Sequence, residues 1–347
     1  MSSAGRHAAR PGRRRPARPR PGPGRAELPA PESPPAPEPG RREPARPERI
    51  RRHQWLAVLG PAARTPRGAI GLVLAGLVVL VAAIGPLVAP HPPDALVTLS
   101  FGKPSRQFPL GGDFLGRDVL SRVLSGGWLL LLMAVCATVI GVAAGATAGV
   151  SAAYLRGRTD GLIMRTVDVI LAFPQLVFAL LLLSILGPKL WLIVLAVGLT
   201  HAPAVARVLR SATLDVAERD FVKVAELQGM RPTAVMAKEI LPNLSTPLMV
   251  ETGLRLTYSI IVMSGLAFLG FGQPPPAPNW GTMINENRAG LALNPWAVIV
   301  PALLIALLTI GTNLFTDAIG RVALGVDRRP AEAILADGLG LTEGRAT

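Results

Sequence analysis

The chain has 347 residues, of which 50% are hydrophobic and only 17% are charged, yet its formal net charge is +14. This combination is typical of a membrane protein with basic flanking segments and argues against a soluble enzyme. The single cysteine, Cys136, excludes an intrachain disulfide framework and a thiolate metal cluster.

Residues 1–53 are rich in arginine and proline, with fourteen arginines against five glutamates. A segment of this composition cannot bury a hydrophobic core, so we predict a disordered cytoplasmic tail whose arginines contact anionic lipid. A nucleic-acid role is disfavoured because no aromatic residues are interleaved for base stacking. Arg51 and Arg52 suggest a twin-arginine export signal as an alternative, but the apolar run that follows them is too long and too apolar for such a signal.

Six long charge-free intervals predict six membrane-spanning helices, because a span needs about 20 apolar residues and a charge at its centre costs roughly 3 kcal/mol. The intervals are 69–89, 129–153, 166–187, 189–209, 248–271 and 296–317. The first is too long for the core of a signal peptide and is expected to be retained. The expected fold is an all-α integral membrane protein built as a bundle of six transmembrane helices.

Lysines and arginines in the connections predict the orientation of these helices. The 154–165 turn, the 210–247 connection and the residues after 317 carry arginines and fall on the same side as the basic N-terminus. Both termini are therefore expected in the cytoplasm, with the protein multi-pass in the plasma (inner) membrane. The loops 90–128 and 272–295 then lie outside, although the first also carries four basic residues.

Three glycines in the second span, Gly141, Gly145 and Gly149, recur every four residues and therefore share one helix face. They predict a close approach of a neighbouring helix, and a permissive scatter of glycine is the alternative. Glu251 and Arg255 lie four residues apart and are expected to pair locally. Prolines inside the predicted spans favour kinks; they are Pro174, Pro203 and Pro301.

The connection 210–247 is predicted to hold two short amphipathic helices. Apolar residues recur at helical spacing from Asp215 to Gln228, and Gly229 can adopt the left-handed conformation that stops a helix. Pro232 suits the first turn of a second helix, which Pro242 is expected to end. Two such helices present a rigid knob to a partner in water, and a helix pair lying on lipid is the alternative.

This connection resembles the EAA loop of the inner-membrane components of ABC importers. The pattern there runs through paired alanines, a glycine, and an apolar helix that ends in Leu-Pro. In this chain the glycine is Gly229 and the ending is ILPN at 240–243. The chain departs from the pattern at Val224, where the first alanine is usual, and at Glu226, where an arginine often stands.

Four further segments are similar to the dipeptide, oligopeptide and nickel importer permeases, in particular to the second permease of the dipeptide system. They are FPLGGDFLGRDVLSRVLSGG, DVILAFPQLVFALLL, FLGFGQPPPAPNWGTMI and NPWAVIVPALLI. The resemblance excludes the 1–53 tail. It implies a first transmembrane helix and outer loop over 54–128, a permease domain over 129–325 with the coupling loop 210–247, and a cytoplasmic C-terminal tail over 326–347.

The resemblance implies a non-catalytic subunit of a type I ABC importer, forming half of the pathway for peptides, nickel or a related small solute. It implies a homologous second permease, two ATP-binding subunits that carry ATP and magnesium, and an extracytoplasmic solute-binding protein. No catalytic residue, metal ligand or cofactor is expected on this chain, which lacks GxxxxGK[ST]. The residues expected in the ATPase-coupling loop are Phe221, Val224, Ala225, Glu226, Gly229, Met230, Pro232, Leu241, Pro242 and Asn243.

Two outer segments are candidates for a gate or for contact with the binding protein, and a short interfacial helix is the alternative for the first. Their candidate residues are Gly116, Arg117, Asp118, Asn279 and Trp280. An ion-gradient-driven secondary transporter is the alternative function, but it needs internal repeats and a charge at the membrane midplane, and we find neither in the sequence. An intramembrane enzyme is disfavoured, because His201 is expected to pack or to stabilise a kink rather than catalyse.

Overall fold

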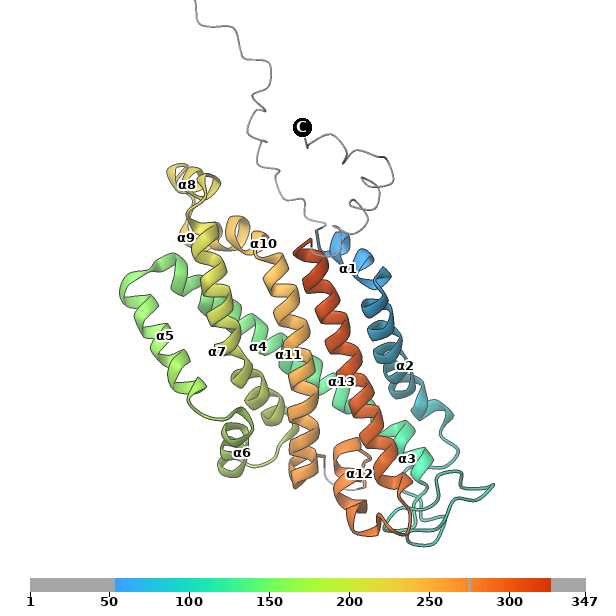
Figure 1. Cartoon of the computed structure of the whole chain (residues 1–347). Helices are drawn as coiled ribbons and strands as arrows, with labels where there is room; N and C mark the ends of the chain where they lie inside the picture. Colours follow the sequence, from blue (N-terminus) through green and yellow to red (C-terminus); the bar gives the residue numbers. More distant parts are fainter. Residues whose placement is uncertain (1–53, 274–275, 326–347) are drawn as a thin grey trace, which may run out of the picture. The chain divides into compact units, whose positions relative to one another are not determined.

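The computed structural model describes residues 54–273 and 276–325 (Figure 1). These residues form helices joined by loops, together with two isolated β-bridges in the segment 96–118. The all-α prediction is confirmed. The predictions of a disordered tail over 1–53 and of a cytoplasmic tail over 326–347 lie outside the described residues.

Five helices are each long and apolar enough to cross a membrane. They are α2 (Pro66–Val88), α4 (Trp128–Leu155), α7 (Leu190–Ala217), α11 (Ser245–Leu266, continued by a π-helical turn, Ala267–Phe271) and α13 (Trp296–Ala323). They match five of the six predicted intervals. The helices α7 and α13 run past the last apolar residue of those intervals, because polar residues with helical propensity continue the backbone hydrogen bonding.

The third predicted span, 166–187, is wrong as a single helix. The chain forms α5 (Gly157–Leu171) and α6 (Gln175–Leu186), which meet at 88° and supply a sixth span only as a bent pair. The break lies at Pro174, which lacks an N–H group and disfavours helical geometry in the residue before it. By contrast, Pro203 and Pro301 lie inside helices that continue through them.

The glycine face predicted in α4 is confirmed as a close contact with α7. A Cβ atom added at Gly141 would lie 2.7 Å from the carbonyl oxygen of Gly198, and one at Gly145 would lie 2.5 Å from that of Ala202. Gly149 contacts the Ala206 backbone in the same way. Small residues allow the two helix backbones to approach, which is the usual way that membrane helices gain packing energy.

Two features of the bundle were not predicted. Helix α1 (Gln54–Arg64) precedes α2, and Thr65 caps α2 by accepting a hydrogen bond from Gly68 N. Gly71 of α2 lies against α13, where an added Cβ atom would be 2.7 Å from the Gly311 carbonyl oxygen. A small apolar cluster joins α1 to α11 and α13; its buried members are Ala62, Met249, Ala318, Ile319 and Val322.

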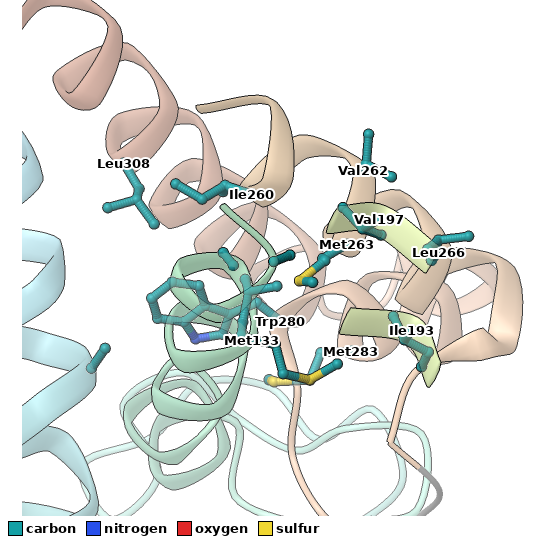
Figure 2. Close-up of a cluster of buried hydrophobic side chains, with 14 of the residues drawn as sticks. Met133, Ile193, Val197, Ile260, Val262, Met263, Leu266, Trp280, Met283 and Leu308 are labelled. Carbon is teal, nitrogen blue, oxygen red and sulfur yellow. The ribbon is translucent and has the colours of Figure 1, made fainter. Parts of the chain in front are cut away.

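The main apolar core lies among α4, α7, α11, α13 and α12 (Trp280–Asn287), residues of which Figure 2 labels, and it also includes buried residues of α2, α3 (Val119–Ser125) and α6. Trp280 is fully buried there beside Met133 and Met283. Figure 1 shows α1, α8 (Asp220–Leu227), α9 (Pro232–Val235) and α10 (Leu241–Asn243) at one end of the bundle and α3 and α12 at the other. The predicted local pair between Glu251 and Arg255 is present, with Arg255 Nε 3.1 Å from Glu251 Oε2.

Candidate functional site

The segment between α7 and α11, residues 218–244, is named here the connecting loop. It contains α8 (Asp220–Leu227), α9 (Pro232–Val235), a π-helical turn (Met236–Ile240) and α10 (Leu241–Asn243). Gly229 has φ +75° and Pro232 opens α9, as the sequence predicts. The sequence did not reveal that α7 itself ends at Ala217, so that α8 is a separate helix.

The second helix ends beside Pro242, as the sequence predicts. Helical turns follow one another without a gap from Pro232 to Asn243, one residue past this proline. The chain then passes through a turn at Leu244 and enters α11 at Ser245. The connecting loop therefore runs directly into a membrane-spanning helix.

An apolar cluster fixes the connecting loop onto the ends of three long helices. The loop contributes Val222, Ala225, Val235, Ile240 and Leu244. The helices α4, α7 and α11 contribute Ala146, Val150, Val205, Leu209, Val216 and Leu248. These side chains pack together as one apolar cluster, so the loop is attached to α4, α7 and α11 at the same place. This cluster is named here the loop cluster.

Polar side chains add a second attachment that the sequence did not predict. The Tyr154 hydroxyl group at the end of α4 donates a hydrogen bond of 2.7 Å to Glu226 Oε1 on α8. Arg156 Nη2 lies 3.4 Å from Glu218 Oε1. Glu226 is one of the two positions at which the loop departs from the importer pattern, and here its carboxylate joins α8 to α4.

The opposite face of the connecting loop exposes large apolar side chains. Leu227 is 88% exposed, Val224 is 49% exposed and Leu241 is 38% exposed. Leu227 was not among the predicted residues, although its place before the glycine stop puts it at the tip of α8. Gly229 has no heavy atom within 4 Å of an added Cβ atom, so its positive φ alone calls for glycine there.

The predicted coupling residues thus divide into two groups. Ala225 is buried, and Phe221 and Met230 are half-buried against the loop cluster. The residues exposed to solvent are Val224, Glu226, Gly229, Pro232, Leu241 and Pro242. Asn243 is half-buried and donates a hydrogen bond of 2.6 Å to the Glu239 carbonyl oxygen. The first group can hold the loop in place, and the second can meet a partner.

At the other end of the bundle, residues 90–127 and 276–294 form what is named here the cap, which includes α3 (Val119–Ser125) and α12. Four side chains in it form an ion-pair network. Arg117 Nε lies 2.6 Å from Asp113 Oδ2, and Arg122 Nε lies 3.3 Å from the same oxygen. Arg117 Nη2 and Arg122 Nη2 each lie 3.1 Å from Glu286 Oε2.

Three members of this network are buried, with Arg117 2% exposed and both Arg122 and Asp113 0% exposed, and Glu286 is 16% exposed. Two guanidinium groups face two carboxylates, so the network has no formal net charge. A buried ion is stable only when it is paired and hydrogen-bonded, so each member depends on the others. The network therefore joins α3 and the loop before it to α12.

The remaining predicted outer residues also lie in the cap and make internal contacts. Asp118 caps α3 by accepting hydrogen bonds from Leu120 N and Ser121 N, each 3.2 Å long. Asn279 caps α12 by accepting one of 2.9 Å from Gly281 N. Trp280 Nε1 donates one of 2.8 Å to the Val123 carbonyl oxygen, and Gly116 has φ +85°. The structure brings the five residues together and buries most of their polar atoms.

Comparison with known proteins assigns the fold to a family. Residues 123–323 match the family described as binding-protein-dependent transport system inner membrane component. The chain is similar to the di/tripeptide transport system permease protein DppC of Pseudomonas aeruginosa, with 36% identity over 263 residues, covering 73% of this chain and 86% of that protein.

Two further relatives match this chain with similar identity. A putative peptide transport system permease protein of Brucella suis is 34% identical over 251 residues, covering 72% of this chain and 84% of that protein. The glutathione transport system permease protein GsiD of Escherichia coli is 37% identical over 216 residues, covering 62% of this chain and 71% of that protein.

Proposed function

The chain belongs to the family of binding-protein-dependent transport system inner membrane components, and from this premise we propose that it moves peptides inward using work received from a separate ATPase. It is a permease subunit of an ATP-binding cassette importer, which sets aside the alternative of an ion-gradient-driven transporter. What we propose in addition is the cargo, the site of coupling to the ATPase and the partner subunits.

The observation that carries the proposed coupling is the two-sided construction of the connecting loop. One face is packed into α4, α7 and α11 through the loop cluster, and the other exposes Leu227, Val224 and Leu241 to solvent. Burying large apolar side chains stabilises an interface by roughly 1.5–3 kcal/mol each. The exposed face is the docking surface for the ATP-binding subunit, and the packed face delivers the movement.

ATP and magnesium bind the partner subunits in this proposal, since the chain has no GxxxxGK[ST] sequence. When the two ATP-binding subunits close on nucleotide, each of them moves the connecting loop of the permease that is docked on it. The three helices that share the loop cluster then move together, because a rigid connection loses little of the displacement to conformational entropy. The pathway opens alternately to the two sides of the membrane.

The proposed assembly contains a second, homologous permease, two ATP-binding subunits and an extracytoplasmic solute-binding protein. The connecting loop and both termini face the cytoplasm in this arrangement. Two observations support this orientation: α1 lies at the same end of the bundle as the connecting loop, and that end carries the arginine-rich turn after α4 (Figure 1). The cap then faces outward, and we propose that its five predicted residues hold the outer gate rigid.

The permease domain is proposed to extend over 129–325, with α1, α2 and the first part of the cap preceding it. Peptide cargo is proposed because the relatives named above transport di- and tripeptides, peptides or glutathione. The test is uptake by the complete transporter in a host that lacks its own peptide importers. Labelled di- and tripeptides should accumulate and compete with one another; uptake of nickel that peptides do not inhibit contradicts the cargo proposal.

A further inference from the structure

A chain of hydrogen bonds crosses the bundle at the start of α6. Gln175 Nε2 lies 2.9 Å from both His201 Nδ1 and Thr200 Oγ1 on α7. His201 Nε2 lies 2.9 Å from Ser259 Oγ on α11, and that oxygen lies 3.1 Å from Thr138 Oγ1 on α4. His201 and Ser259 are fully buried. These hydrogen bonds therefore connect four helices at one level of the bundle.

The partners of each group determine the direction of these hydrogen bonds. The Thr138 hydroxyl group donates to the Ala134 carbonyl oxygen at 2.7 Å, so it accepts from Ser259. Ser259 then accepts from His201 Nε2, which leaves Nδ1 of the imidazole ring to accept from the Gln175 amide. Every donor in the chain has an acceptor when the imidazole is neutral and carries its proton on Nε2.

The backbone alone does not hold α6 in this position. The helical hydrogen bonds of α5 stop at Phe173, whose N–H donates to the Ile170 carbonyl oxygen, and Pro174 has no N–H group to continue them. Helix α6 then leaves at 88°. Its residues Ala179 and Leu183 are fully buried in the main core, but apolar packing of this kind is non-directional. Directional hydrogen bonds are what can set the register of α6 on α7.

Three of the four helices joined by these hydrogen bonds, α4, α7 and α11, are the ones to which the connecting loop is packed. Members of the loop cluster on these helices are Ala146 and Val150 on α4, Val205, Leu209 and Val216 on α7, and Leu248 on α11. His201 lies one helical turn before Val205 on α7. Helix α6 contributes no residue to the loop cluster among the described residues, so a movement of the loop reaches it through its contacts with α7 and α11.

We propose that Gln175 and His201 are positioning residues for transport, and that the chain Gln175–His201–Ser259–Thr138 latches α6 to the three helices that the connecting loop moves. With the latch closed, α6 follows those helices in each transport cycle. With the latch broken, the loop still binds its ATPase, but α6 slips against α7 and the pathway opens incompletely. The proposal rests on the proposed coupling role of the connecting loop.

The first test measures the position of α6 without relying on transport. A Cβ atom at Gly265 of α11 would lie 3.3 Å from Leu176 Cδ1 of α6. The substitutions Leu176→Cys and Gly265→Cys, in a Cys136→Ala background, give a disulfide reporter in the complete transporter. Adding Gln175→Leu should lower the disulfide yield at short oxidation times by about threefold to tenfold, the scale of one hydrogen bond between membrane helices. An unchanged yield overturns the latch.

The second test uses a matched pair of serines on α11. Ser259→Ala removes a link of the latch, whereas Ser264→Ala removes a buried hydroxyl group that has no hydrogen-bond partner among the described residues. Disulfide yield and uptake should fall with Ser259→Ala and remain at the starting level with Ser264→Ala. The double variant Gln175→Leu, Ser259→Ala should lose no more than the worse single variant, because the latch is one unit. Equal effects of the two serine variants, or additive losses in the double variant, contradict the proposal.

Recovery of the ATP-binding subunit with each variant separates the latch from the coupling site. It should match that of the parent protein, because the connecting loop is unaltered. Ser259→Ala is the smallest of these changes. If it prevents recovery of the ATP-binding subunit, the hydrogen bonds serve folding in general and the latch is rejected. Should the parent transporter take up none of the peptides offered, the cargo proposal fails while the disulfide comparison still decides the latch.

Discussion

Arg122 and Glu286 lie 164 residues apart in the chain, and their side chains form a 3.1 Å ion pair inside the cap. Arg122 also donates hydrogen bonds of 3.3 Å to the carbonyl oxygens of Pro93 and Pro276. One side chain thus joins the segment before α3 to the segment around α12. Such long-range polar contacts join the two segments of the cap, so the loss of one charge affects both.

Arg122→Gln should destabilise the cap by about 3 kcal/mol, because it removes one of the two guanidinium groups that pair with the buried Asp113 carboxylate and the partly buried Glu286 carboxylate. Thermal unfolding of the purified protein in detergent measures the loss as a lower midpoint. Arg106→Gln is the matched control, since Arg106 is exposed on the same outer loop. Equal midpoints for the two variants contradict the structural role of the network.

Gly229→Val should impair coupling, because an L-residue at φ +75° is strained by about 1–2 kcal/mol and a β-branched side chain makes the strain worse. Gly229→Asn should be tolerated, since asparagine adopts this conformation more readily and open space surrounds the site. The measurements are peptide uptake and recovery of the ATP-binding subunit from membranes. Full uptake and normal recovery with valine would refute the requirement for the left-handed stop.

Leu227→Ser should weaken the attachment of the ATP-binding subunit by about tenfold, in line with the loss of roughly 1.5 kcal/mol of apolar burial. The fold should not change, because Leu227 is 88% exposed. Leu162→Ser on α5 is the control, since Leu162 is 70% exposed but lies outside the connecting loop. A titration of the purified ATP-binding subunit onto membranes measures both. If the two variants bind it equally well, the docking face lies elsewhere.

Gly145→Val should separate α4 from α7, since its Cβ atom would meet the Ala202 carbonyl oxygen at 2.5 Å. Overpacking of this kind costs about 1–3 kcal/mol. Gly76→Val on α2 introduces the same side chain where no heavy atom lies within 4 Å of the new Cβ atom. The amount of protein in the membrane and the midpoint of thermal unfolding should fall for Gly145→Val and remain unchanged for Gly76→Val. The reverse order would show that the glycine face does not pack as described.

Single cysteines test the orientation in the membrane. In a Cys136→Ala background, Ser105→Cys lies in the cap and Thr233→Cys lies on the connecting loop, and both positions are exposed. A membrane-impermeant maleimide added to intact cells should label the first and leave the second unmodified. Permeabilised cells should give labelling at both. Labelling of Thr233→Cys alone in intact cells would invert the proposed topology.

Local signals in the amino-acid sequence determined much of this protein. The long apolar intervals located five of the spans, and the four-residue glycine spacing in α4 identified its contact face with α7. Gly229 and Pro232 located the stop and start of the loop helices, because a positive φ and a missing N–H group are requirements of single residues. Each of these signals acts within a few residues of its position.

Tertiary contacts decided the rest. Pro174 favoured a kink, but the 88° bend depends on the docking of α6 against α7 and α11, and Gln175 meets His201 only after that docking. Likewise, no local pattern places Tyr154 beside Glu226, 72 residues away. Hydrogen bonds and ion pairs have directional or distance requirements that distant segments satisfy only once the helices have packed, so their partners are set by the assembled bundle and not by spacing along the chain.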